Sequence, residues 1–182
     1  MAQASVAYDH RSGTYAGVFV SNVRLGHDRR NGAQVLGYAG YSARLPSGGL
    51  SWDAGAAYSG FSGSDGYGYA EYHVGLAHAN WSARLSYAPR YFGQDYSAAY
   101  AELNLTPGSE RALAPLLHVG AQRWSASPYL EADHAWDARI GISYSHDLLT
   151  AQLSWGTASK SRAVAGGGRD RSGWVLRLTR WI

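Results

Sequence analysis

The residues of this chain that could do chemistry are histidines and carboxylates that stand close together in sequence. His73 follows Glu71 by two positions, and acids lie beside histidines at 133–134 and within 145–147, where a serine is also present. A hydrolase needs a nucleophile, a histidine base and an orienting acid that converge on one point. None of these groups has a recognisable catalytic spacing. We therefore predict that the protein is not an enzyme, and an outer-membrane lipid-modifying enzyme is the least favoured alternative.

Metal and nucleic-acid chemistry have little support in the sequence. The seven histidines show no close ligand spacing, and the absence of cysteine excludes disulfides and thiolate metal sites. The net charge is +3, but the arginines are dispersed and form no basic helix or known nucleic-acid motif. We predict no metal, no cofactor and no nucleic-acid partner.

A stronger pattern places the charges on one side of alternating segments. Residues 136–144 put Trp136, Ile140 and Tyr144 on one face of a strand, with Asp137 and Arg139 on the other. Residues 50–58 and 81–87 repeat this alternation. A period of two is that of a β-strand with two different faces. Bulky apolar residues opposing small and charged ones are typical of a transmembrane β-barrel, with lipid outside and water inside.

Aromatic residues bracket the apolar face of these strands. Trp52 and Tyr58 stand six positions apart, and Trp136 and Tyr144 stand eight apart. At about 3.3 Å per residue the brackets span roughly 20–26 Å along the strand, close to an outer-membrane apolar band of about 25 Å. Strand propensity alone also enriches Trp and Tyr. We interpret the brackets as membrane-interface girdle residues: Trp52, Tyr58, Trp81, Tyr87, Trp136, Tyr144, Trp155 and Trp174.

The composition favours this interpretation over a soluble barrel. Charged residues make up 16% of the chain, and Lys160 is its only lysine. A soluble barrel needs many solvated groups on its outer face. The sequence contains no apolar run near the 18 or so residues of a spanning helix. We expect one domain over 1–182, located in the bacterial outer membrane.

Turn signals divide the chain into eleven candidate strands joined by alternately short and long connections. Bacterial barrels have short turns on the periplasmic side of the membrane and long loops on the extracellular side. Such barrels close with even strand numbers. We therefore predict an all-β, antiparallel transmembrane barrel with eleven visible strands, in which either one strand has been split or missed or an N-terminal strand is absent. The strands are predicted at 3–10, 14–24, 34–44, 50–59, 67–78, 81–90, 96–106, 113–123, 134–145, 149–158 and 172–181.

The first residues carry no signal-peptide pattern before the first predicted strand. Export to an outer membrane requires such a peptide, so we expect the sequence to be a mature or trimmed form.

Four segments carry a family resemblance: GTYAGVFVSNV (13–23), YGYAEYHVGLAH (67–78), ARLSYAPRYFG (83–93) and YAELNLT (100–106). In order and spacing they resemble the TorF family of porins, a group of proteobacterial outer-membrane proteins. The resemblance implies an outer-membrane barrel of about twelve strands. That family has a first strand, with a Ser-Asp-Tyr and Arg-Gly pattern, that has no counterpart before Ala4.

The face opposite the aromatic brackets is predicted to line the lumen, because a charge facing lipid costs roughly 2–4 kcal/mol. We expect Glu71 to lie beside Arg84, and the charges either to set selectivity or to hold the barrel together. The favoured function is a small porin for passive passage of small hydrophilic solutes, with membrane lipids and lipopolysaccharide as further partners. A non-conducting structural or ligand-binding barrel is the alternative, in which loop aromatics such as Phe61, Tyr91, Phe92 and Tyr129 contact ligands. The predicted lumen residues are Asp53, Glu71, His73, Arg84, Glu102, His118, Asp137, Arg139 and Arg177.

Overall fold

The computed structural model describes residues 3–25, 30–46, 48–62, 66–108, 111–125, 133–159 and 171–180. Within these ranges the chain forms eleven strands and one 3₁₀ turn, η1 (Tyr91–Gly93). The strands are β1 (Gln3–Asp9), β2 (Thr14–Leu25), β3 (Arg30–Arg44), β4 (Ser51–Phe61), β5 (Tyr69–His78), β6 (Trp81–Ala88), β7 (Ala98–Leu105), β8 (Leu113–Trp124), β9 (His134–His146), β10 (Leu149–Ala158) and β11 (Arg171–Arg180).

All eleven strands belong to one sheet, and each pairs antiparallel with its neighbours in sequence. The predicted all-β, antiparallel fold is therefore confirmed. Each predicted strand has an observed counterpart, although β2 and β3 extend to Leu25 and Arg30 and so shorten the connection expected between them. No helix among the described residues has both the length and the apolar character needed to cross a membrane.

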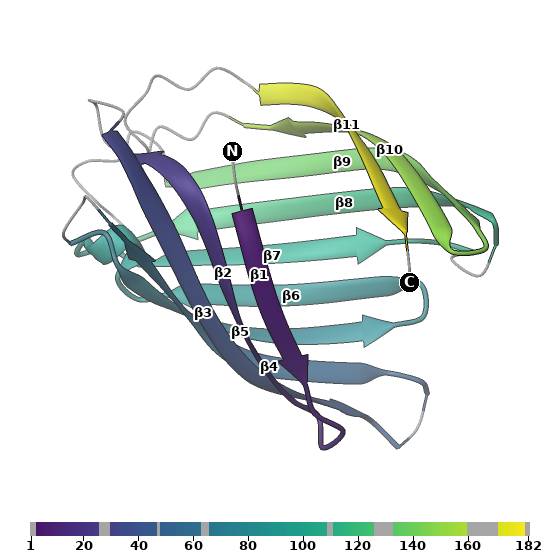
Figure 1. The fold of residues 1–182 in the computed structure, drawn as a ribbon, viewed down its shortest axis with the longest axis horizontal. Coiled ribbons are helices and arrows are strands. Elements are labelled where there is room, and N and C mark those ends of the chain that lie inside the picture. The colour runs from purple at the N-terminus through teal and green to yellow at the C-terminus, as the bar shows by residue number, and fades with distance from the viewer. Residues whose placement is uncertain are drawn as a thin grey trace.

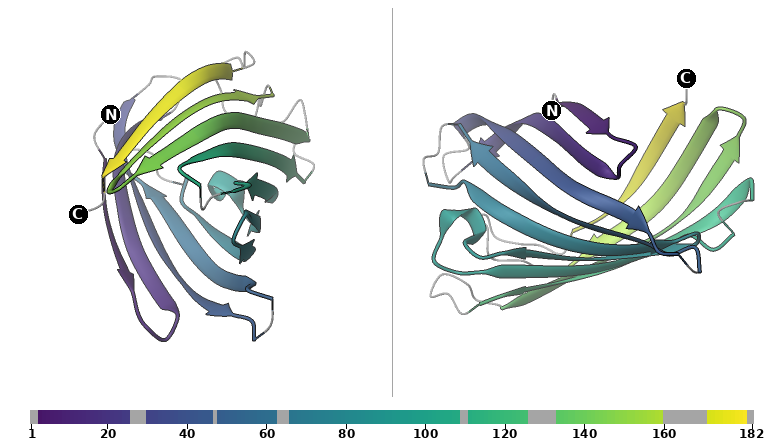
Figure 2. Two further views of the ribbon diagram at one scale, coloured as in Figure 1. Left: turned by 90° about the vertical axis from the view of Figure 1, so that its right-hand side faces the viewer. Right: turned by 90° about the horizontal axis from the view of Figure 1, so that it is seen from below.

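The sheet is strongly curved and open. Its edge strands β1 and β11 lie on the same open side (Figures 1 and 2), but no pairing joins them in the described residues. A closed barrel of about twelve strands is therefore not part of the observed fold. Both edge strands leave one row of backbone hydrogen-bonding groups without a strand partner.

The connections give the sheet two different ends. At the short-turn end, the turns include 10–13, 79–80 and 147–148, and at the long-loop end the connections include 89–97 and 125–133. His10, Gly13 and Thr14 close the first turn through backbone hydrogen bonds of 2.8 and 2.9 Å. The predicted alternation of short and long connections is present from β3 onward, but the first connection predicted to be long, 26–29, has no more residues than the turn at 10–13.

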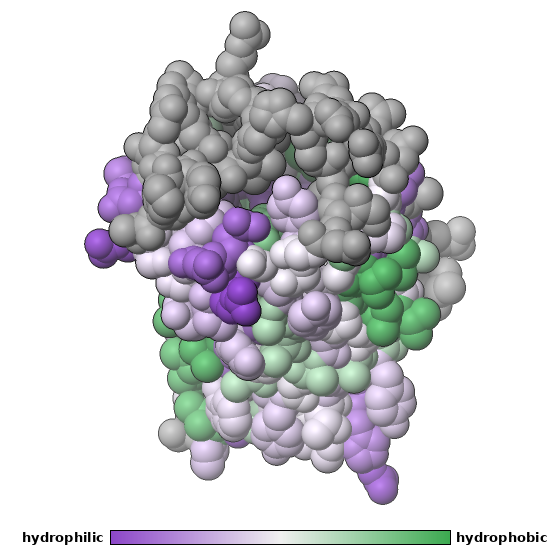
Figure 3. Space-filling model, turned by 90° about the vertical axis from the view of Figure 1, so that its left-hand side faces the viewer, coloured by the Kyte–Doolittle hydropathy of each residue, from purple (hydrophilic) through white to green (hydrophobic). Residues whose placement is uncertain are grey.

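The two faces of the sheet differ in chemistry because side chains alternate along every strand. We call the concave side the inner face and the convex side the outer face. The outer face exposes apolar side chains on every strand, from Val6 (78% exposed) on β1 through Ile140 (58%) on β9 to Leu176 (66%) on β11. Viewed from the long-loop end, hydrophobic surface lies on the flanks and more polar surface between them (Figure 3).

Tight side-chain packing occurs on the inner face at the long-loop end. Trp124 is 3% exposed and clusters with Tyr96 and Ala98, against which Tyr91 and Ala135 pack. Elsewhere on the described strands, buried residues are mostly small, such as Ser59 and Ser154. The sheet therefore has a localised apolar core rather than one that fills its interior.

We predict that Trp124→Ala lowers the free energy of unfolding by about 3–5 kcal/mol, the usual cost of deleting a buried tryptophan. Trp174→Ala is the matched control because Trp174 is 71% exposed on the outer face. Its loss should be less than half as large in urea unfolding of the detergent-refolded protein, followed by circular dichroism. Equal losses would contradict the position of this core.

Candidate functional site

The inner face brings charged residues from four strands into one row across the sheet. The register runs from Asp53 on β4 to Gly75 on β5, and from Gly75 to Arg84 on β6. Arg84 in turn pairs with Glu102 on β7, and this row continues through Gly120 on β8 to Asp137 on β9. We call Asp53, Arg84, Glu102 and Asp137 the charged belt. The belt places both signs of charge at one level of the concave face.

The first polar cluster is built around Asp53. Its Oδ2 accepts hydrogen bonds from the hydroxyl of Tyr15 (3.2 Å) and from Nη2 of Arg84 (3.3 Å). Nε2 of His73 lies 3.0 Å from the same oxygen and 2.9 Å from the Tyr15 hydroxyl. The side chain of His73 is 10% exposed and that of Asp53 is 22% exposed. The cluster links β2, β4, β5 and β6 through side chains.

Tyr15 reaches this cluster because glycines clear its path. In register, Tyr15 on β2 faces Gly40 on β3, Gly40 faces Gly55 on β4, and Gly55 faces His73 on β5. A Cβ added at Gly55 would lie 2.7 Å from the Ala39 carbonyl oxygen and 2.9 Å from the Tyr15 hydroxyl. Aromatic side chains that cover strand glycines stabilise curved sheets. Here the same arrangement carries a hydroxyl across two strands.

A second cluster repeats the same residue types on β7, β8 and β9. The hydroxyl of Tyr100 donates to Oδ2 of Asp137 (2.9 Å), and Nε2 of His118 lies 2.7 Å from Oδ1 of Asp137. Nδ1 of His118 lies 2.7 Å from Oδ1 of Asn104. Tyr100 lies over Gly120, where an added Cβ would collide with the Tyr100 hydroxyl. Each half of the sheet thus contains one tyrosine, histidine and aspartate cluster.

All nine predicted lumen residues lie on the inner face, but they are not equivalent. Asp53, His73 and Arg84 are held in the first cluster, and His118 and Asp137 in the second. The remaining charged residues of the set have no oppositely charged side chain within salt-bridge distance among the described residues. These are Glu71, Glu102, Arg139 and Arg177.

The expectation that Glu71 lies beside Arg84 is wrong. Arg84 faces Gly75, four residues along β5 from Glu71, and its carboxylate partner is Asp53 two strands away. Gly75 has no side chain, so it leaves the space across which the two charges meet. Tyr15, Tyr100 and Asn104 were not predicted as site residues. Their positions in the alternation of each strand place them on the inner face, which the sequence pattern could have indicated. Their hydrogen-bond partners could not be predicted in this way, because they depend on the strand register.

Aromatic side chains gather on the inner face at the long-loop end. The ring of Phe92 lies 5.1 Å from Tyr69, 5.7 Å from Phe61 and 4.7 Å from Tyr91, measured between centroids. We call Phe61, Tyr69, Tyr91 and Phe92 the aromatic cap. Phe61, Tyr91 and Phe92, predicted as ligand-contacting loop residues, thus pack on one another, and Tyr129 lies outside the described residues.

The connection that carries η1 is bent toward the sheet. Phe92 has a φ of 51°, in the left-handed region that non-glycine residues seldom adopt. Burial raises the pKa of the Tyr91 phenol, and the side chain of Gln122 on β8 acts in the opposite direction. The bend and the ring contacts of Tyr91 and Phe92 with Tyr69 hold the cap against the inner face.

The predicted girdle residues all lie on the outer face, at two levels. Trp52, Trp81 and Tyr144 lie near the short-turn end. The others lie toward the long-loop end, where Trp155 and Trp174 are direct partners across β10 and β11. Among outer-face residues with described side chains, the only Asp, Glu, Lys or Arg is Arg123 at the long-loop end. The girdle residues toward the long-loop end are Tyr58, Tyr87, Trp136, Trp155 and Trp174.

The acid and histidine neighbours at the sheet ends do not form a catalytic arrangement. Asp133 and His134 form an exposed pair at 2.8 Å. His146 lies 3.4 Å from Asp147, while the Ser145 hydroxyl pairs with Thr150 at 3.2 Å rather than with a histidine. No group of three or more His, Cys, Asp or Glu within the described ranges could hold a metal ion.

Fold and site together define an up-and-down antiparallel sheet protein with an apolar convex face and a charged concave face. The chain belongs to the Gcw_chp family, described as a bacterial protein of unknown function, whose family model matches residues 1–172. No curated protein and no solved structure matches the chain.

Gly55→Ala should destabilise the protein by about 1–3 kcal/mol, the usual cost of overpacking, because the backbone oxygen of Ala39 cannot move aside cheaply. Gly37→Ala is the control, since nothing lies within 4 Å of a Cβ at Gly37 on the adjacent strand. It should leave stability unchanged or raise it by up to about 1 kcal/mol. Denaturant unfolding of both variants measures the difference. A Gly55→Ala variant as stable as the parent protein would contradict the claim that Gly55 leaves the space through which Tyr15 reaches the first cluster.

Proposed function

We propose that this protein is an outer-membrane β-barrel that forms a narrow pore for small hydrophilic solutes. The observation that carries the proposal is the outer face. Its apolar side chains run without interruption across eleven strands, including Val74 (55% exposed), Leu85 (50%) and Leu178 (65%). Soluble proteins rarely expose contiguous apolar patches larger than a few hundred Å². Lipid is the environment that such a face fits.

The proposal includes closure of the sheet. β1 and β11 both run toward the short-turn end, so a direct pair between them would be parallel. Single-chain bacterial barrels close antiparallel with even strand numbers. A twelfth strand between the edges, antiparallel to both, meets this requirement and agrees with the barrel size implied by the resemblance to the TorF porins.

The inner face supports a polar path. Charges held in the two clusters brace the sheet, whereas Glu71, Glu102, Arg139 and Arg177 are not neutralised by a described partner. Such charges are the ones that can act on a passing ion. Ion selectivity should therefore depend on this second group more than on Asp53 or Asp137.

The aromatic cap favours a second candidate function, a non-conducting structural or ligand-binding barrel. The cap occupies the inner face at the long-loop end, where Tyr91 and Phe92 pack against Tyr69 of β5. A permanently packed cap would block the path that the charged belt lines. Conductance separates the two candidates directly.

We expect the refolded protein to give discrete channels in planar bilayers. Arg139→Glu should shift reversal potentials toward cation selectivity because it reverses an unpaired inner charge. Arg123→Glu is the matched control, since Arg123 lies on the outer face at the rim, and its selectivity should stay close to that of the parent protein.

Folding of each variant is checked by the change in gel mobility on boiling. A folded protein without any conductance would overturn the porin proposal in favour of the non-conducting barrel. Identical selectivity of Arg139→Glu and the parent protein would mean that the assigned inner face does not line the path.

A further inference from the structure

The outer face contains a trough floored by small residues. In register, Ala16 on β2, Ala39 on β3 and Ala56 on β4 form one row, flanked by Tyr8 on β1 and Tyr72 on β5. With strands about 4.8 Å apart, the two tyrosines stand about 19 Å apart across the row. Three neighbouring alanines between two large rings leave a depression in this part of the outer face.

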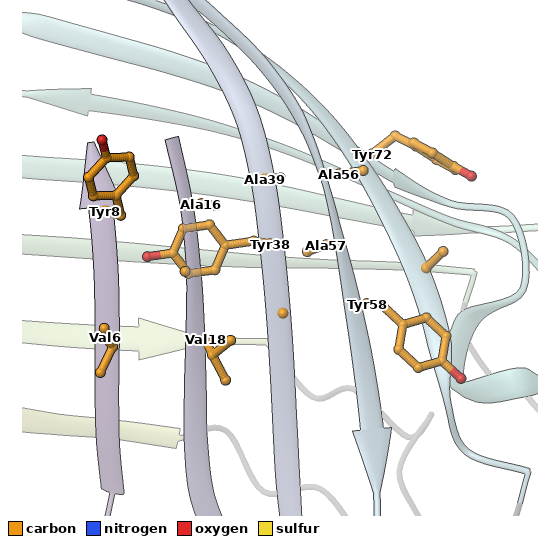
Figure 4. A pocket seen from close by; sticks show the side chains of 13 residues that line it. Val6, Tyr8, Ala16, Val18, Tyr38, Ala39, Ala56, Ala57, Tyr58 and Tyr72 are labelled. Carbon is orange, nitrogen blue, oxygen red and sulfur yellow. The ribbon is translucent and has the colours of Figure 1, made fainter. Parts of the chain in front are cut away.

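The trough continues in the next row toward the long-loop end. There Gly37 extends the floor, Val6 and Val18 line it on one side, and Tyr58 stands on the other. Tyr58 and Tyr72 stand beside the alanine row (Figure 4). The trough is open to the outside and has a volume of about 730 Å³. Apart from tyrosine hydroxyls, its lining side chains are apolar, so its occupant is apolar over this part.

A second pocket, which contains Arg90, adjoins the trough at the rim. It measures about 360 Å³ and shares Tyr58 and Ala70 with the trough. Its other lining residues include Tyr69, Pro89 and Arg90 from β5 and from the connection after β6. The pocket therefore joins the outer face to a cationic group at the long-loop end.

Arg90 is available for an anion. Its side chain is 72% exposed, and its ion pair with Asp95 is long, at 3.5 Å, with Asp95 itself 98% exposed. Exposed pairs of this kind contribute little. A guanidinium forms paired hydrogen bonds with phosphate oxygens, so a phosphate can compete with Asp95 for Arg90.

We propose that this site binds one anionic phospholipid, with an acyl chain in the trough and the phosphate at Arg90. The apolar trough on the sheet matches the acyl chain of such a lipid. The adjoining pocket with Arg90 at the rim matches its phosphate. The inference rests on the proposed membrane location, since that location supplies the lipid. It adds a specific lipid site to a face that would otherwise contact lipid uniformly.

The test counts lipids retained by the detergent-refolded full chain in native mass spectrometry. The probes are dimyristoyl phosphatidylglycerol, dimyristoyl phosphatidylcholine and inorganic phosphate. We expect one phosphatidylglycerol per chain and weaker retention of phosphatidylcholine. Arg90→Gln should lower phosphatidylglycerol retention by about fivefold, the equivalent of one exposed charge pair, and Ala56→Phe should lower retention of both lipids by filling the trough.

Matched controls are Arg123→Gln, which removes a rim arginine that lines neither the trough nor the second pocket, and Ala101→Phe, which enlarges an outer-face alanine on β7. Both should retain lipid like the parent protein. Equal losses in controls and test variants would overturn the site. Displacement of the lipid by inorganic phosphate, or a protein dimer without lipid, would also overturn it, in favour of a free-phosphate site or a second copy as occupant.

Flotation of the refolded protein with liposomes separates this inference from the proposed function. If the parent protein inserts into liposomes and yet retains no more phosphatidylglycerol than the Ala56→Phe and Arg90→Gln variants, the lipid site is wrong and the membrane location stands. If it retains one phosphatidylglycerol but does not insert, the membrane proposal fails and the site stands.

Discussion

The structure depends on a continuous antiparallel register that keeps one face apolar across eleven strands. Because side chains alternate with a period of two, a slip of one residue between two strands would exchange their faces. It would place Asp53 or Arg139 among Leu76, Ile140 and their neighbours. The short turns, such as 79–80 and 147–148, limit such slips because they fix which residues face one another.

The same register explains how a sheet without a filled interior acquires order on its concave side. Glycines in line with Tyr15 and Tyr100 leave room for each ring, so that its hydroxyl reaches a histidine and an aspartate. These clusters satisfy charged groups that would be costly to leave half-buried and unpaired. On this face, the glycines that accompany the curvature of the sheet also leave room for the tyrosines of the polar clusters. This combination occurs once in each half of the sheet.

Alternation made much of this fold predictable from the sequence. The strand positions, the two faces and the levels of Trp52, Trp136 and Trp174 follow from local pattern, because period and turn residues are local properties. The partners of the inner charges do not. Arg84 meets Asp53 rather than Glu71 only because Gly75 stands between them in register, and register depends on how far each strand extends beyond its turn. The inward packing of Phe92 depends on a left-handed backbone conformation, which a phenylalanine in the sequence does not predict. The resemblance to a porin family led to the expectation of about twelve strands, whereas the described sheet has eleven and is open.

The central claim, that the outer face meets lipid and the inner face meets water, can be tested on β9 because the chain contains no cysteine. Single substitutions Arg139→Cys, Ile140→Cys, Ile142→Cys and Ser143→Cys would each carry a fluorescent label in protein reconstituted into liposomes. We predict that labels at Ile140 and Ile142 are quenched by nitroxide-labelled lipids, and that labels at Arg139 and Ser143 are quenched only by water-soluble agents. Equal quenching by the water-soluble agent at all four positions would contradict the assignment of the two faces.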